Sequence, residues 1–179
     1  MAELCRHLHI GDAVLSRMNA PLMSTCLQLL KNGVSARIEG RDIGKQLVGM
    51  VRKLRAKSVP DFIRKLYAWG DKQKSRIIAG PKAEAKLSLI TDQVETLNAV
   101  AEGAASVSDI ESRLLSLFQD SDSNAKPAVV LSTVHKAKGL EWDNVFILSG
   151  TFRKSRGAEE ANIYYVAVTR TKKVLTFVE

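Results

Sequence analysis

The chain has 179 residues, of which 45% are hydrophobic and 26% are charged, the proportions of an ordinary soluble globular protein. This length allows one domain with its own core and a small subdomain. No apolar run could span a bilayer and the first residues lack the apolar core of a signal peptide, so we expect neither a membrane protein nor a secreted one. Two cysteines, Cys5 and Cys26, are too few for a disulfide framework and fit reduced thiols in the cytoplasm.

The net charge of +8 is distributed unevenly along the chain. Residues 1–82 contain 16 Lys/Arg and 6 Asp/Glu, residues 83–125 contain 2 and 8, and residues 126–179 contain 9 and 5, which gives balances of +10, −6 and +4. A basic surface concentrates polyanions, so nucleic acid or a nucleotide is a sensible class of partner. A basic surface that is merely solvated explains the charge equally well.

The first part of the chain alternates strands and helices. Residues 13–16 form a short apolar run typical of a buried strand. Ala20-Pro21 then opens a helix that Asn32-Gly33 ends, because Gly33 suits the left-handed position after a helix. Residues 34–38 alternate like a second strand. Asp42 can cap the next helix, which has one apolar face up to Leu54.

A helical region follows. Ser58 and Asp61 resemble a capping box at the start of a helix that runs to about Trp69. A long helix is expected over residues 82–102, and Gly103 ends it. Ser106 or Ser108 then caps a shorter helix, and residues 119–127 read as a polar loop.

After Pro127 the pattern changes again. Residues 128–133 and 144–149 are continuous apolar runs rich in β-branched residues, which suit strands covered on both faces of a parallel sheet. Residues 158–169 read as a helix and residues 174–178 as a final strand. The order of elements predicts an α/β fold interrupted by a helical insertion.

The densest chemical signal is TVHKAKGLE at residues 133–141. A hydroxyl, an imidazole, two lysines, a glycine and a carboxylate follow the end of a strand, where open α/β sheets bind ligands. Thr133 and His135 can donate hydrogen bonds to a phosphodiester, Lys136 or Lys138 can supply charge, and Gly139 allows a close backbone approach. An isolated basic loop of this kind more often only turns the chain.

Three segments together resemble the UvrD/Rep/PcrA-type superfamily 1 DNA helicases. TVHKAKGLEWDNVFIL at 133–148 looks like motif V of that family. EEANIYYVAVTRTKKVL at 159–175 is similar to motif VI, and residues 13–44 resemble motif IV and the segment after it. The resemblance implies the second, C-terminal RecA-like domain of such a helicase. This domain would be a three-layer α/β fold around one sheet, formed by residues 1–44 and 126–179. Residues 45–125 are the helical insertion.

The resemblance also implies roles for individual residues. Arg17 and Arg170 would contact the γ-phosphate of ATP, which suits a guanidinium because it stays charged and can grip two phosphate oxygens. Glu141 would contact the ribose, with Gly139 beside it. Arg170 has an alternative interpretation as a cation that stabilises the end of its helix.

The DNA contacts implied by the same motifs are Thr133, His135, Lys136 and Lys138, with single-stranded DNA as the partner. Some positions depart from the family pattern. Ala161 and Asn162 stand where basic residues are common, so neighbouring contacts to DNA or to a partner domain are in doubt. Trp142 replaces a Phe and Thr171 replaces a small Ala, both tolerable changes.

The features needed to hydrolyse ATP are incomplete in this chain. The only candidate phosphate-binding loop, GRDIGKQ at 40–46, has three residues between its glycines instead of four and Gln46 where Ser or Thr should contact the metal. No apolar strand ends in a paired acidic motif. We therefore expect a first RecA-like domain, of the same or another chain, to hold most of the ATP and Mg²⁺, and no complete ATPase here.

Several alternatives stay open at this point. The chain could be a non-catalytic nucleic-acid-binding module, or a regulatory subunit that completes a partner's ATP site in trans. Zinc held by Cys5, His7, His9 and Cys26 is disfavoured by their spacing, so no metal site is expected. Tyr67 and Trp69, near several lysines, could stack on bases, but aromatic residues on a helix are more often core.

Overall fold

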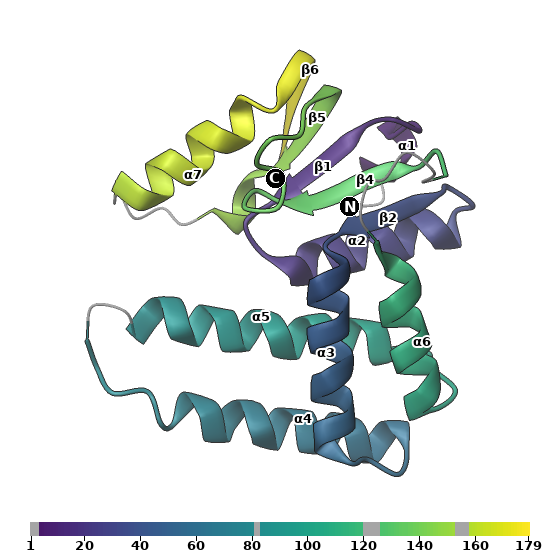
Figure 1. Cartoon of the computed structure of the whole chain (residues 1–179), viewed down its shortest axis with the longest axis vertical. Coiled ribbons are helices and arrows are strands. Elements are labelled where there is room, and N and C mark those ends of the chain that lie inside the picture. The colour runs from purple at the N-terminus through teal and green to yellow at the C-terminus, as the bar shows by residue number, and fades with distance from the viewer. Residues whose placement is uncertain (1–3, 81–82, 120–125, 153–157) are drawn as a thin grey trace. The chain divides into compact units, whose positions relative to one another are not determined.

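A computed structural model describes residues 4–80, 83–119, 126–152 and 158–179, without the side chains of residues 5 and 6. Helices and strands alternate in the first part of the chain, and a run of helices then precedes the remaining strands (Figure 1). The elements are, in order, α1 (Leu4–His7), β1 (Ala13–Ser16), α2 (Asn19–Lys31), β2 (Ala36–Glu39), α3 (Arg41–Leu54), α4 (Val59–Lys74), α5 (Ala83–Ala101), α6 (Val107–Leu117), β3 (Phe118–Gln119), β4 (Val129–Thr133), β5 (Trp142–Leu148), η1 (Ser149–Thr151), α7 (Ala158–Val168) and β6 (Thr171–Val178).

The chain divides into two compact units. The first combines residues 1–41 with residues 117–179, and the second is the contiguous segment 42–116. The sequence placed the corresponding boundaries after residues 44 and 125. A helical unit inserted in an α/β host is the organisation that the order of elements indicated.

A single parallel sheet forms the centre of the first unit (Figure 1). Its strand order is β3-β2-β4-β1-β5-β6, and all neighbouring strands pair in parallel. β1 lies between β4 and β5, and every residue of β1 and β4 is buried. Burial on both faces explains why these strands are continuous apolar runs with no alternation.

Helices cover both faces of this sheet. Ala13, Leu15, Val145 and Ile147 pack with Ile163 of α7 and with the segment after β4. Side chains alternate along a strand, so Val14 points to the opposite face, and α2 contacts β1, β2 and β4. The expected three-layer α/β fold is confirmed.

Cys26 lies on α2 and is completely buried. Burial raises the pKa of its thiol to about 12, because the thiolate would lose its hydration. At neutral pH this cysteine is therefore a small apolar core residue, which matches the expected reduced thiol.

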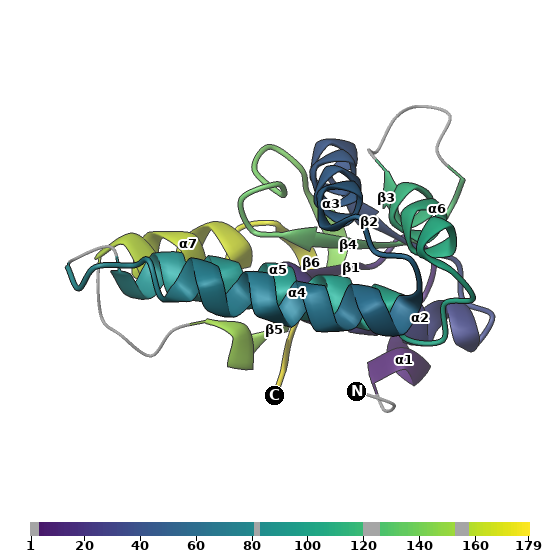
Figure 2. The ribbon, with the colours of Figure 1, turned by 90° about the horizontal axis from the view of Figure 1, so that it is seen from below.

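The helical unit begins its helices as the sequence predicts. The Ser58 hydroxyl accepts a hydrogen bond from the backbone N–H of Asp61 at 3.3 Å, so Ser58 caps α4. Hydrogen bonds from Lys65, from the backbone of Lys57 and from Arg64 hold the pKa of Asp61 well below its usual range. α4 and α5 run side by side (Figures 1 and 2).

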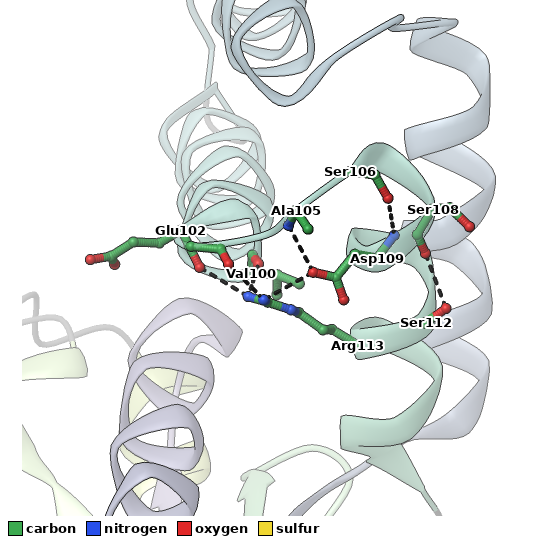
Figure 3. A network of polar contacts seen from close by, with 9 residues as sticks. Val100, Glu102, Ala105, Ser106, Ser108, Asp109, Ser112 and Arg113 are labelled. Atoms are coloured by element: carbon green, nitrogen blue, oxygen red, sulfur yellow. Dashed lines mark hydrogen bonds and ion pairs between the residues drawn. The ribbon is translucent and has the colours of Figure 1, made fainter.

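The turn between α5 and α6 is held by a polar network (Figure 3). Ser106 accepts from the backbone N–H of Asp109 at 3.1 Å, and the Asp109 carboxylate accepts from the backbone N–H of Ala105 at 2.9 Å. Arg113 of α6 donates to the carbonyls of Glu102 and Gly103, at 3.0 and 2.8 Å. Ser106 is therefore the cap of α6, and Arg113 satisfies carbonyls that the end of α5 leaves exposed.

Some expectations were wrong in detail. Residues 4–7 form a short helix that the sequence did not indicate. α3 begins at Arg41, which places Asp42 in its first turn. Tyr67 is 48% exposed, so it is not a core residue. Most of the polar loop expected at 119–127 lies outside the described residues.

Candidate functional site

Two of the predicted site residues, Arg17 and Thr133, lie at the carboxyl ends of adjacent strands. β1 and β4 pair in register, with Ser16 opposite Thr133, and Arg17 comes next in the chain. The backbone N–H of Val134 donates to the carbonyl of Ser16 at 3.0 Å, which continues the pairing past the end of β4. The carboxyl ends of β1 and β4 therefore bring Arg17 and the start of the 133–141 segment to one place.

The 133–141 segment leaves β4 as a series of turns. The carbonyl of Thr133 accepts from the backbone N–H groups of Lys136 and Ala137, at 3.0 and 2.9 Å. Gly139 has a φ of +88°, a left-handed conformation that favours glycine. The chain then reaches Trp142, the first residue of β5. This segment connects the carboxyl end of one strand to the amino end of a parallel strand.

Arg170 lies where this segment enters β5. Its guanidinium donates from Nε to the carbonyl of Val166 at 3.0 Å, and from its two terminal nitrogens to the carbonyl of Leu140 at 3.2 Å and to Oγ1 of Thr169 at 3.1 Å. Its carbonyl accepts from the backbone N–H of Trp142 at 3.0 Å. Arg170 thus stabilises the last turn of α7, as the alternative interpretation of this residue described, and ties α7 to the 133–141 segment.

The two residues expected at the ribose are neighbours in sequence of a residue that Arg170 contacts. Gly139 and Glu141 flank Leu140, whose carbonyl Arg170 contacts. The Glu141 side chain is 53% exposed and its carboxylate lies 3.8 Å from Nζ of Lys172. A long ion pair at this exposure is weak, so the carboxylate remains available to a ligand hydroxyl.

Arg17 is held at the other end of α7. Its Nε donates to Oε2 of Glu160, in the first turn of the helix, at 3.5 Å. Arg170 is bound to Val166, in the last turn. The two anchors are six residues apart, about 9 Å along the helix. The structure therefore holds the two arginines near opposite ends of α7 and does not bring them together.

The predicted DNA contacts gather around Arg17. Thr133 is only 8% exposed, whereas His135 and Lys138 are exposed. Partial loss of hydration of the His135 ring, and then the positive charge of Arg17, lower its pKa, and the carboxylates of Glu159 and Glu160 act in the opposite direction. The lowered pKa favours the neutral imidazole, which keeps one N–H that can donate to a phosphate oxygen.

A hollow of about 220 Å³ opens between the 133–141 segment and α7. Its floor is apolar and its rim carries polar and charged side chains. The lining residues are Val134, Ile163 and Val166 on the floor, with His135, Lys138, Glu159 and Asn162 on the rim. The hollow places one of the unusual motif VI positions, Asn162, beside the expected DNA contacts.

Two residues of this site were missed by the sequence reasoning. Glu160 contacts Arg17, and Oγ1 of Thr151 accepts from the backbone N–H of Arg17 at 3.0 Å. Glu160 lies inside the segment similar to motif VI, so a charge-pairing argument could have singled it out. Thr151 follows β5 with no signal in the sequence.

A metal-binding set is not found in the part of the chain that the structure describes, where no three His, Cys, Asp or Glu side chains gather. The acidic groups at the site are Glu141, Glu159 and Glu160, and they do not form a cluster that would suit Mg²⁺. The candidate phosphate-binding loop at 40–46 enters α3 at Arg41 and is helical from there.

Sequence comparison identifies the family. The family model of the UvrD-like helicase C-terminal domain matches residues 36–179. The chain belongs to this family. The resemblance based on the three motifs is thereby confirmed, and the fold, a parallel α/β sheet with a helical insertion, agrees with it.

This UvrD-like domain is similar to a protein named F-box DNA helicase protein 1 from Schizosaccharomyces pombe, with 33% identity over 122 residues. The alignment covers 60% of this chain and 13% of that relative. The chain therefore spans a small part of the relative's length. Across the described residues, none of the helices has the length and apolar character needed to cross a membrane.

Proposed function

We propose that this helicase motor domain supplies Arg17 and Arg170 to the γ-phosphate of ATP and part of the track for single-stranded DNA. Magnesium and most of the nucleotide would be held by a first RecA-like domain of the same or another chain. The domain by itself would not hydrolyse ATP. In the assembled helicase, which we place in the cytoplasm, closure of the two domains on ATP would move the motor along single-stranded DNA.

The observation that carries this proposal is the course of the 133–141 segment. His135, near the start of this connection, lies beside Arg17, and Lys138 lines the same hollow as His135. At the end of the connection, Gly139 and Glu141 flank Leu140, whose carbonyl Arg170 contacts. Residues suited to a DNA backbone and residues suited to a nucleotide therefore belong to one continuous segment. Such a segment can transmit a change at one ligand to the other.

The chemistry of the arginines supports the nucleotide role. Phosphoryl transfer spreads negative charge over the γ-phosphate oxygens, and a guanidinium positioned there lowers the barrier. Arg17 is held through Nε, so its two terminal nitrogens can donate to a ligand. Arg170 is bound to neutral acceptors that a phosphate, being charged, can replace.

The ATPase experiment uses the chain alone and the chain joined to a first RecA-like domain. Alone, we expect no hydrolysis above background, with or without single-stranded DNA. Joined, Arg17→Ala and Arg170→Ala should each lower kcat by at least about a hundredfold. Lys173→Ala is the matched control, because Lys173 is an exposed cation of the same unit whose side chain pairs with Asp143. Normal kcat in both arginine variants would refute the assignment.

The DNA experiment measures the affinity of the chain for a labelled oligothymidine by fluorescence anisotropy at several salt concentrations. His135→Ala should weaken binding, and Lys138→Ala should also reduce the dependence on salt by about one counterion. A chain that binds DNA but never restores hydrolysis to a first domain would instead be the non-catalytic binding module.

A further inference from the structure

The side chain of Arg17 is held along one edge. Its Nε lies 3.5 Å from Oε2 of Glu160, and the two side chains are 23% and 12% exposed. A guanidinium carries donors on three nitrogens, so this contact uses one of them. Within the described residues, the terminal nitrogens of Arg17 reach no acceptor, so they are available to an external ligand.

The backbone of Arg17 is held as well. Its N–H donates to Oγ1 of Thr151 at 3.0 Å, and that hydroxyl donates in turn to the carbonyl of Leu148, the last residue of β5, at 2.7 Å. Arg17 is therefore fixed at its backbone by η1 and at its Nε by α7. With its backbone fixed and its guanidinium restrained at Nε, the Arg17 side chain loses less entropy on binding a ligand than an unrestrained arginine would.

Charges of both signs lie around Arg17 among the described residues. The groups that face His135 are Arg17 after β1 and the carboxylates of Glu159 and Glu160 on α7, with Lys138 on the rim of the same hollow. Glu160 offsets the positive charge that Arg17 places beside the imidazole. Removing that carboxylate would free the guanidinium to swing and would change the field at His135.

We infer that Glu160 is a positioning residue, which holds Arg17 by Nε so that its two terminal nitrogens face a phosphate oxyanion. The carboxylate stays outside the ligand contact and acts through the guanidinium. The identity of that phosphate, the γ-phosphate of ATP or a DNA phosphodiester, rests on the proposed function. The positioning of Arg17 by Glu160 does not depend on the proposed function.

The first test uses the chain without any ligand. NMR measures how fast the Arg17 Nε proton exchanges with water. We expect exchange to accelerate about tenfold in Glu160→Ala and by less in Glu160→Gln, whose amide oxygen still accepts a hydrogen bond. Glu159→Gln is the matched control. It removes a neighbouring carboxylate that also acts on His135, and it should leave Arg17 exchange unchanged. Equal exchange in the wild type and Glu160→Ala would overturn the inference.

The second test uses the complete helicase. We expect Glu160→Ala to lower kcat about tenfold with little change in KM, Glu160→Gln to restore part of the loss, and Glu160→Ala to cause no further loss when Arg17 is already Ala. Urea unfolding of each variant separates this effect from a loss of folded protein. A full additional loss in the Arg17→Ala background would show that Glu160 does not act through Arg17, which would overturn the inference.

The same variants distinguish the source of the phosphate. If Glu160→Ala and Arg17→Ala keep kcat but weaken oligothymidine binding to a similar extent, the positioning role stands and the nucleotide role of Arg17 fails. If both variants lower kcat and leave DNA binding intact, both proposals are supported. If Glu160→Ala leaves kcat and DNA binding unchanged, the positioning role is refuted.

Discussion

Arg170 donates from its guanidinium to the backbone carbonyl of Leu140, at 3.2 Å. The contact joins residues 30 apart in the chain and connects the two segments that carry motifs V and VI. A residue expected to act on a nucleotide is therefore also a structural link of the domain. This double role determines how its variants should be interpreted.

Arg170→Ala should destabilise the isolated chain as well as impair hydrolysis. The substitution removes three hydrogen bonds from a half-buried cation, and we expect a loss of about 1–3 kcal/mol in the free energy of unfolding. Urea denaturation measures it. Lys173→Ala, the exposed control on β6, should stay within about 0.5 kcal/mol of the wild type. An Arg170→Ala chain as stable as the wild type would mean that these bonds contribute nothing to the fold.

His135 should make the stability of the domain depend on pH. Its pKa in the folded state lies below the ordinary value of 6.5, so the unfolded state binds more protons between the two values. The free energy of unfolding should thus fall as pH decreases from 6.5 toward the folded pKa, and this contribution is complete above 6.5. Urea denaturation of wild type and His135→Gln over this range isolates the histidine, because every other group is common to both. Parallel pH profiles would contradict the lowered pKa.

Single-stranded DNA should reverse part of that shift. A phosphodiester close to the imidazole favours its charged form, so the pKa of His135, followed by NMR, should rise when oligothymidine is added. His9 serves as an internal reference, because its side chain is 81% exposed and lies outside the predicted track. Equal changes at both histidines would show that DNA does not bind specifically at His135.

Gly139→Ala should strain the 133–141 segment without any clash. A Cβ at this position would meet nothing within 4 Å, so the penalty comes from the φ of +88° alone. We expect a cost of about 1–2 kcal/mol in unfolding free energy. Gly150→Ala is the control, since it has equally open space and no left-handed φ. If the two variants are equally stable, the left-handed conformation at Gly139 is not required.

Gly70→Ala should destabilise the helical unit through a steric clash and not through backbone strain. A Cβ on Gly70 would lie 2.8 Å from Cγ2 of Val94, where α4 meets α5. We expect a loss of about 1–3 kcal/mol from overpacking. Adding Val94→Ala provides the missing room, so the double variant should be less destabilised than the sum of the single ones. Strict additivity would show that the two residues do not touch.

The parts of the fold that the sequence predicted are those with local causes. Residues 129–133 and 145–148 are rich in apolar and β-branched residues, which suits strands that are covered on both faces. Ser58 and Ser106 each cap a helix by bonding the backbone of its third residue. The two-residue strand β3 was not predicted, because it consists only of its pairing with β2. A segment that short has no periodicity to detect.

The site was predicted as a set of residues and not as an arrangement. The motifs selected Arg17, His135 and Arg170, but they did not show that Arg17 lies beside His135 while Arg170 binds the far end of α7. The contact between Arg17 and Glu160 joins residues 143 apart, and only the folded sheet brings them together. Distances of this kind have no signature in local sequence.

The position of β1 at the middle of the sheet has a consequence for how the chain folds. The two strands that flank β1, β4 and β5, lie more than a hundred residues further along the chain. The helical unit is therefore translated after β1 and before either of them. During synthesis the edges of β1 remain unpaired until β4 and β5 leave the ribosome, whereas residues 42–116 are already complete. The insert can therefore fold before its host, while β1 waits for two strands that are made much later.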